Sequence, residues 1–204
     1  CSFRNTTLHE TVLEDLRFDQ CDLAAVRNIS GDCRGFDFSG SDLSGLDLTG
    51  WCLEEATLCK GNLQGACLKN ADLRGSDCSE ANLQKVDATG ADFQDASLAM
   101  ADLLEAKLTG ANLAGAQLAG ANLFGCDFQG AILRYANLGD AKVDYPALAK
   151  AEMKGILLQG RDLSSMDFSG VDFSEGDFTG VNFSNGCLRG VNFSDADLSL
   201  ANLQ

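Results

Sequence analysis

Residues 71–75 read Ala-Asp-Leu-Arg-Gly, and residues 111–115 read Ala-Asn-Leu-Ala-Gly. The same pattern continues from Phe3 to Leu203 without a change of register. It consists of a small residue, Asp or Asn, a central Leu or Phe, and two variable residues of which the second is often Gly. Leu or Phe fills 35 of the 41 central positions. The chain is therefore a tandem array of five-residue repeats.

A period of five excludes the two common regular structures. In an α-helix, five residues rotate the central position by about 140° net, which would scatter Leu around the helix and leave no apolar stripe. In a β-strand, side chains alternate between faces, so the central residue would change face at every repeat. The period instead predicts a corner after each pentapeptide. The small and central residues then face inward, and Gly takes the positive φ of a type II turn.

Four corners close a square coil of 20 residues, and successive coils stack about 4.8 Å apart through parallel pairing. The pattern Ala-[Asp/Asn]-Leu-x-x resembles the pentapeptide-repeat family over residues 1–204. The resemblance implies an all-β fold, a right-handed quadrilateral parallel β-helix (a solenoid) of about ten coils. The central residues should fill its axis. The expected structural core includes Leu73, Leu83, Phe93, Leu103, Leu113, Leu123, Phe168, Phe173, Phe178 and Phe183.

Two stretches depart from the pattern. Residues 1–35 hold poorly matched inward residues such as Leu16 and Asn28, so we expect degenerate N-terminal coils there. In residues 142–158, Pro146 removes a backbone donor, and Tyr145 stands where Gly is usual. We expect an irregular coil at this point, with an irregular edge or a small bulge. The sequence leaves open whether a partner binds it or whether it is a local irregularity without function.

The array forms a single domain, residues 1–204, and both of its ends raise the question of what covers them. A stacked solenoid needs polar or covered ends, and the repeat runs in phase to Gln204. The chain also begins with Cys1. We therefore expect this domain to be part of a longer chain. Its ends would be continued by further sequence, covered by another domain, or paired end to end with a second copy.

The net charge of −15 limits the classes of partner. Proteins that bind nucleic acid by neutralising phosphates are basic, so direct nucleic-acid binding is not expected. An acidic body attracts proteins with a basic surface. No apolar run reaches the length of a membrane span, and no signal peptide is visible, which favours a bacterial cytoplasmic protein or a secreted effector.

Folding the sequence at 20 residues sorts the charge by face. The face that contains residues 11–15 sums to −8 and is the candidate partner-binding acidic face. Its acidic residues alternate for most of their length with Gly35, Gly75, Gly115 and Gly155. This spacing either limits repulsion between like charges or forms an acidic stripe that imitates a nucleic-acid backbone. The carboxylates expected to project from its turns are Glu14, Asp15, Glu54, Glu55, Asp95, Glu175 and Asp195.

The sequence offers no catalytic, metal or cofactor motif. His9 is the only His, and the paired carboxylates lie on a convex rod without a predicted pocket, so we expect a protein that is not an enzyme. The cysteines lack the close spacing of a zinc site. Cys1 and Cys21 are one coil apart and could form a disulfide, although a reducing compartment would keep them free. Cys33 and Cys78 stand at central positions and should be buried, whereas Cys52, Cys67 and Cys187 should face outward.

Two functions fit these observations. The first is a non-enzymatic protein–protein interaction or scaffold module, a role in which pentapeptide-repeat domains of effector proteins are found. The second follows from a resemblance to family members that act as DNA mimics and bind, modulate or protect a type II topoisomerase (DNA gyrase). The acidic faces favour the second function. The absence of a dimerising segment after the last coil and of loops between coils favours the first.

Overall fold

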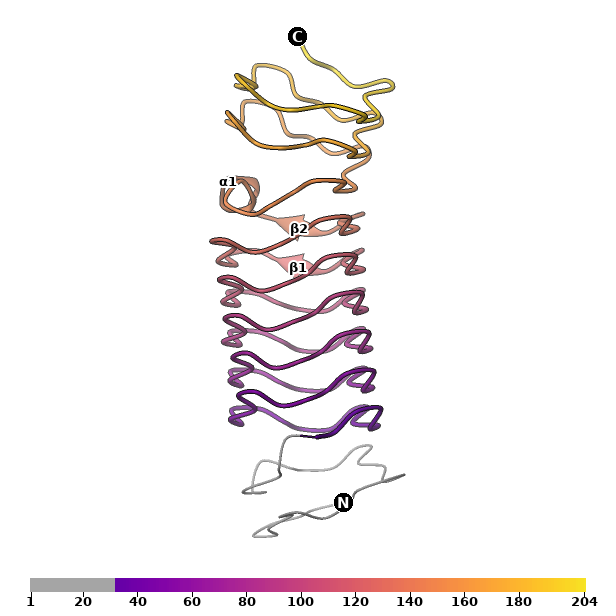
Figure 1. Ribbon diagram of the computed structural model, residues 1–204, viewed down its shortest axis with the longest axis vertical. Coiled ribbons are helices and arrows are strands. Elements are labelled where there is room, and N and C mark those ends of the chain that lie inside the picture. Colours follow the sequence, from indigo (N-terminus) through magenta and orange to yellow (C-terminus); the bar gives the residue numbers. More distant parts are fainter. Residues whose placement is uncertain (1–31) are drawn as a thin grey trace, which may run out of the picture.

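The computed structural model describes residues 32–204, which form one rod of stacked square coils (Figure 1). Residues 20 apart pair in parallel, as Asp72 does with Asp92. The Leu73 amide donates to the Asp92 carbonyl at 2.7 Å, and the Asp92 amide donates to the Ala71 carbonyl at 2.9 Å. These two bonds recur along the rod and set the register between coils. Most residues of the expected degenerate coils, 1–35, lie outside the described part.

Each pentapeptide ends in a tight corner. At a typical corner the Ser76 amide donates to the Leu73 carbonyl at 3.1 Å, and Gly75 has a φ of +64°. Positive φ at the third residue of such a turn defines type II. Fifteen corners between residues 32 and 204 hold a residue other than glycine at this position, with φ between +53° and +62°. Each of these residues adopts a left-handed conformation that costs roughly 1–2 kcal/mol relative to Gly.

The Asp or Asn before each central residue shapes the corner. Its side-chain oxygen accepts a hydrogen bond from the backbone amide two residues later, as Asp42 does from Ser44 at 3.1 Å and Asp167 from Ser169 at 2.9 Å. This is the local turn for which Asp and Asn are favoured. Fourteen aspartates make the bond: Asp37, Asp42, Asp47, Asp72, Asp77, Asp87, Asp92, Asp102, Asp127, Asp162, Asp167, Asp172, Asp177 and Asp197.

The central and small residues fill the axis. The ten residues named as core from the sequence each expose 1% or less of their surface. In the C-terminal coils the axis is aromatic, with the rings of Phe173 and Phe178 4.8 Å apart and those of Phe178 and Phe183 5.7 Å apart. Such tilted pairs stabilise the core beyond the apolar area they bury.

Regular secondary structure is brief. Strands β1 (Asn122–Leu123) and β2 (Lys142–Val143) pair in parallel, and one helical turn, α1 (Tyr145–Leu148), follows β2 with Pro146 in its first turn. Figure 1 shows α1 at the side of the rod, where the regular spacing of the coils is interrupted. Within residues 32–204, no helix has the length and apolar character that crossing a bilayer requires.

Candidate functional site

Within residues 32–204, the acidic residues predicted for partner binding lie along one edge of the rod. Glu14 and Asp15 lie outside the described residues. Glu54 precedes the corner position of its turn. Glu55, Asp95, Glu175 and Asp195 occupy that corner position itself, with φ of +58°, +56°, +60° and +59°. We call these four the corner carboxylates. Unlike the fourteen turn-forming aspartates, they accept no backbone amide within their own turns in the described chain.

Packing between neighbouring coils restricts some corners of this edge to glycine. The Asp95 side chain lies across Gly115 of the next coil, so that a Cβ on Gly115 would fall against Asp95 Oδ1 and 3.3 Å from its Cγ. The Glu55 side chain leaves more room, since a Cβ on Gly75 would lie 3.7 Å from Glu55 Cγ, an ordinary contact. The Tyr135 ring covers the Cβ position of Gly155 on this same edge. Asp95 and Tyr135 therefore restrict the corners 20 residues later to glycine, although side chains also follow one another at other corners, as at Glu175 and Asp195.

The N-terminal part of the edge carries an arginine among its carboxylates. Arg74 pairs with Asp72 at 2.6 Å and with Glu54 of the coil below at 3.4 Å. Glu54, Glu55, Arg74 and Asp95 surround a shallow hollow of about 230 Å³. Arg74 holds the pKa of Asp72 below its usual value, first through their side-chain hydrogen bond. The hollow thus presents two carboxylates, Glu55 and Asp95, without an ion pair among residues 32–204.

Ligand atoms of Cys52, Glu54 and Asp72 lie within 4.8 Å of one another, beside the same hollow. Three such atoms could in principle hold a metal ion. The Arg74 guanidinium, however, already neutralises Glu54 and Asp72. We therefore assign no metal to this cluster.

Glu175 sits in a different environment. Lys154 pairs with it at 2.9 Å, and the Tyr135 hydroxyl, two coils away, donates to its Oε2 at 2.5 Å. The Tyr135 hydrogen bond and then the Lys154 contact lower the pKa of Glu175. Sequence reasoning named Glu175 without its partners. Both could have been found by folding the chain at 20 residues, because Lys154 is one coil below Glu175 and Tyr135 is two.

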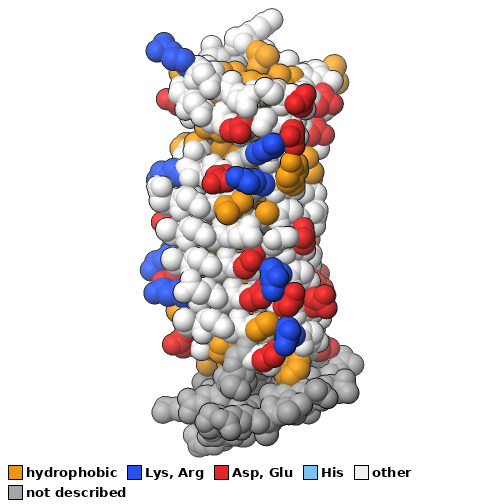
Figure 2. Space-filling view, in the orientation of Figure 1, with side chains coloured by type: hydrophobic (Ala, Val, Ile, Leu, Met, Phe, Trp, Pro, Cys, Tyr) orange, Lys and Arg blue, Asp and Glu red, His pale blue; other side chains and the backbone are white. Residues whose placement is uncertain are grey.

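Cations are therefore interleaved with carboxylates on this face. Its −8 falls to −6 within the described residues, since Glu14 and Asp15 supply −2. Spread over a rod about 41 Å long at 4.8 Å per coil, that is one net charge per roughly 7 Å, whereas duplex DNA carries one per about 1.7 Å. Figure 2 shows acidic and basic side chains side by side along one edge of the rod. The face is acidic but much less densely charged than nucleic acid.

The cysteines divide by burial. Cys33, Cys78 and Cys126 are buried, and desolvation raises the pKa of each thiol to about 12. Cys187 is exposed, while Cys52, Cys59 and Cys67 are half-buried. Cys1, Cys21 and His9, singled out from the sequence, lie outside the described residues.

The fold and its corners define a class of protein: a four-sided β-helix whose coils are each built from four pentapeptides. The chain belongs to the family described as Pentapeptide repeats, which matches it in 8 copies over residues 37–75, 76–113, 111–144, 151–190 and 177–204. Its fold is accordingly the right-handed quadrilateral β-helix. The family match leaves out residues 145–150, which contain α1.

Solved structures of the same family resemble the chain. One is HetL, a pentapeptide repeat protein involved in heterocyst differentiation regulation from the cyanobacterium Nostoc sp. strain PCC 7120. It is 27% identical, with a TM-score of 0.64 over 98% of this chain and 84% of HetL.

Two others are more distant in structure. Rfr23 from the cyanobacterium Cyanothece 51142 is 31% identical, with a TM-score of 0.38 over 49% of this chain and 62% of its own. QnrB1, a plasmid-mediated fluoroquinolone resistance protein, is 21% identical, with a TM-score of 0.46 over 89% and 90%. A comparison with curated protein sequences gave no match.

Proposed function

We propose that this chain is a protein-binding module without catalytic activity, and that its corner carboxylates contact a basic surface on the partner. The observation that carries the proposal is where these side chains stand. Glu55, Asp95, Glu175 and Asp195 occupy positive-φ corners at which glycine is more stable, and they form no turn hydrogen bond that the fold requires. Residues held in strained backbone conformations cluster at functional sites.

The similarity to HetL supports an interaction role, since that protein takes part in regulation and matches nearly the whole of this chain. The alternative of a DNA mimic acting on a type II topoisomerase draws on the same carboxylates. The low charge density of the face and the cations Arg74, Arg134 and Lys154 on it weigh against that alternative. A partner with a few well-placed cations fits this edge better than one built to hold a continuous duplex.

A pair of charge-matched variants tests the proposal. The corner variant changes Glu55, Asp95, Glu175 and Asp195 to Gly, which relieves backbone strain as it removes four charges. The control changes Asp77, Asp127, Asp162 and Asp197 to Asn, which removes four charges but keeps each turn, because Asn makes the same bond at Asn62 and Asn112. Both proteins carry a net charge of −11, since each loses four negative charges from −15.

Cross-linking capture from a bacterial lysate, quantified by mass spectrometry, compares these two variants with the parent. Proteins captured by the parent and the control, but lost from the corner variant, are the expected result. Equal loss from both variants would show that net charge alone drives the contacts and would refute the assignment to the corners. A parallel DNA gyrase supercoiling assay decides the alternative, since inhibition that disappears only in the corner variant would establish the mimic.

A further inference from the structure

The coil that carries α1 is only partly paired with the coil after it. Residues 20 apart form a bridge or a strand pair throughout residues 32–204 except at four places around α1: 127 with 147, 142 with 162, 147 with 167, and 152 with 172. Three of these four lie between the same two coils. Pairing resumes on the remaining side, where Leu157 bridges Asp177. The stack therefore lacks this pairing along three of its four sides at one level, and the gap closes at the end of the third side, where the Gly155 amide donates to the Ser174 carbonyl at 2.7 Å.

The sequence accounts for this split. Pro146 and Tyr145 replace a corner with the helical turn α1, although buried Leu148 keeps its central position. On the next coil Arg161 stands where a small residue is usual. It is 19% exposed and donates from Nη2 to the Leu138 carbonyl at 3.0 Å. The α1 turn and the Arg161 side chain replace the close contact that Ala and a regular corner would make.

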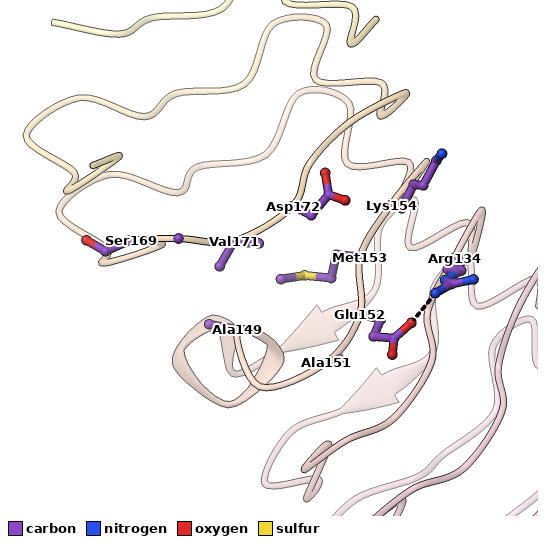
Figure 3. A pocket seen from close by; sticks show the side chains of 10 residues that line it. Arg134, Ala149, Ala151, Glu152, Met153, Lys154, Ser169, Val171 and Asp172 are labelled. Carbon is purple, nitrogen blue, oxygen red and sulfur yellow. Dashed lines mark ion pairs between the residues drawn. The ribbon is translucent and has the colours of Figure 1, made fainter. Parts of the chain in front are cut away.

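The split leaves a cavity of about 410 Å³ beside α1. Figure 3 shows its walls: Ala149, Ala151 and Met153 on the α1 coil and Val171 on the next coil supply apolar surface. Charged side chains stand at its rim, where Arg134 pairs with Glu152 at 2.7 Å and Asp172 lies on the opposite wall. A volume of this size lies within the range of ligand sites.

Both walls present backbone groups without a partner among residues 32–204. Above and below the split the usual bonds are intact, as from Leu133 to Glu152 at 2.8 Å and from Phe173 to Asn192 at 2.8 Å. Across it, the Met153 amide, the Ala151 carbonyl, and the amide and carbonyl of Asp172 make no backbone hydrogen bond. The cavity thus has an open strand edge on each side, which is the feature that strand addition uses.

We propose that this split receives one extended segment of a partner protein, added as a strand parallel to the coils on both sides. By the pairing seen between regular coils, the amide of the segment's middle residue donates to the Ala151 carbonyl, and its carbonyl accepts from the Met153 amide. The amide of the following residue donates to the Asp172 backbone carbonyl, and the carbonyl of the preceding residue accepts from the Asp172 backbone amide. Three successive residues would therefore form four backbone hydrogen bonds, two with each wall.

The walls also define the side chains of the segment. The residues before and after the middle one face inward against Ala151, Met153 and Val171, so they should be small and apolar respectively. The middle residue points outward between Glu152 and Asp172, whose carboxylates favour an amide or a cation. This inference deepens the proposed function, because it requires a protein-binding module, but it uses residues other than the corner carboxylates.

A peptide taken from the chain itself provides the probe. Its sequence is that of residues 110–116, Gly-Ala-Asn-Leu-Ala-Gly-Ala. In it, Ala-Asn-Leu supplies the small residue, the amide and the apolar residue in the order required, and these residues lie on the same side of the rod two coils below the α1 coil. The capped, fluorescently labelled peptide should bind saturably in an anisotropy titration, and Lys in place of its Asn should strengthen binding. Methylation of the Asn and Leu backbone nitrogens removes the two donors and should weaken binding at least tenfold.

Two protein variants test the location. One replaces residues 141–150 by the sequence of residues 121–130 and adds Arg161→Ala, which restores two regular repeats and closes the split. The other, Val171→Trp, fills the cavity and keeps α1. Each should weaken binding at least tenfold, while hydrogen exchange at Met153 and Asp172 should slow in the parent when peptide is added.

Binding that is unchanged by N-methylation or by both protein variants would overturn the proposal. The absence of binding at 1 mM peptide would also overturn it, because a dissociation constant of 1 mM corresponds to a binding free energy of only about −4 kcal/mol. A parent protein that forms dimers which the peptide dissociates would assign the split to a second copy instead of a partner. The corner variant should bind the peptide as the parent does, so failure here and failure of the proposed function are separate results.

Discussion

The position of the Asp95 side chain over Gly115 makes a quantitative prediction for Gly115→Ala. Gly115 has a φ of +70°, and the new Cβ would fall against the Asp95 side chain. The left-handed backbone costs about 1 kcal/mol for Ala. Moving the short Asp95 side chain out of its rotamer adds about 0.5–1.5 kcal/mol. We therefore expect Gly115→Ala to reduce the free energy of unfolding by about 2 kcal/mol.

Gly110→Ala is the matched control, because Gly110 has a φ of +64° and a Cβ there would meet nothing within 4 Å. It should cost about 1 kcal/mol, from the backbone alone. Asp95→Gly should stabilise by about 1 kcal/mol, and adding it to Gly115→Ala should recover the extra loss. The double-mutant cycle would then give a coupling of about 1 kcal/mol between residues 20 apart.

Urea unfolding followed by circular dichroism measures all four proteins. In a chain of this length 1 kcal/mol corresponds to roughly 2–4 °C in melting temperature, which calorimetry resolves. If Gly115→Ala costs no more than Gly110→Ala, or if the coupling is zero, the Asp95 side chain does not restrict residue 115 to glycine.

Three further predictions concern acid, the core and the thiols. The turn hydrogen bonds lower the pKa of aspartates such as Asp162 below the usual 3.8. The stabilisation from these bonds is therefore complete above about pH 3.8 and is lost as the pH falls through the lower pKa of the folded state. The free energy of unfolding should be flat from pH 7 to 5 and fall below about pH 4, and a flat curve down to pH 2 would contradict this. Phe178→Ala should cost about 3–5 kcal/mol in urea unfolding, because the ring is fully buried against Phe173, and a loss under 1 kcal/mol would mean that the aromatic axis is not tightly packed. A thiol reagent at pH 8 should modify Cys187 within minutes and Cys78 only after unfolding, since burial raises the pKa of Cys78 to about 12. Early modification of Cys78 would show that the rod opens locally.

The repeat determined most of the fold in advance. A period of five with a central Leu or Phe predicts a square coil, because that shape keeps every central residue inside. Gly marks the corners of the coil. Local chemistry also explains the Asp before each centre, but that explanation required the hydrogen bond from Asp42 to Ser44 and its equivalents to be seen. Sequence alone could not separate these structural carboxylates from those free for a partner.

The α1 segment shows where sequence reasoning reached its limit. Pro146 and Tyr145 indicated an irregular coil but not its form, because a bulge, an edge and a helical turn all tolerate Pro at that point. The split between coils depends as well on Arg161, which lies on the following coil and whose side chain reaches back to Leu138. Effects that combine two coils are invisible to a pattern read one pentapeptide at a time.

The same is true of the acidic edge. Glu54 and Glu175 were named from their position on one face, yet Arg74 and Lys154 pair with them from neighbouring coils. Charges summed by face are correct in total, but ion pairs between coils decide which carboxylates remain free. Glu55 and Asp95 are therefore the residues to which partner-binding experiments should give most weight.

The interchange of Asp and Asn in the turns has a consequence for how such proteins diverge. Fourteen of the negative charges belong to aspartates whose turn bond Asn could make equally well, so replacing all of them would bring the net charge from −15 to −1 with the same backbone. Isoelectric point can then drift over several pH units among relatives without selection on the fold. Conservation of carboxylates at glycine-preferring corners, rather than overall acidity, is what an evolutionary comparison should use to recognise a shared partner.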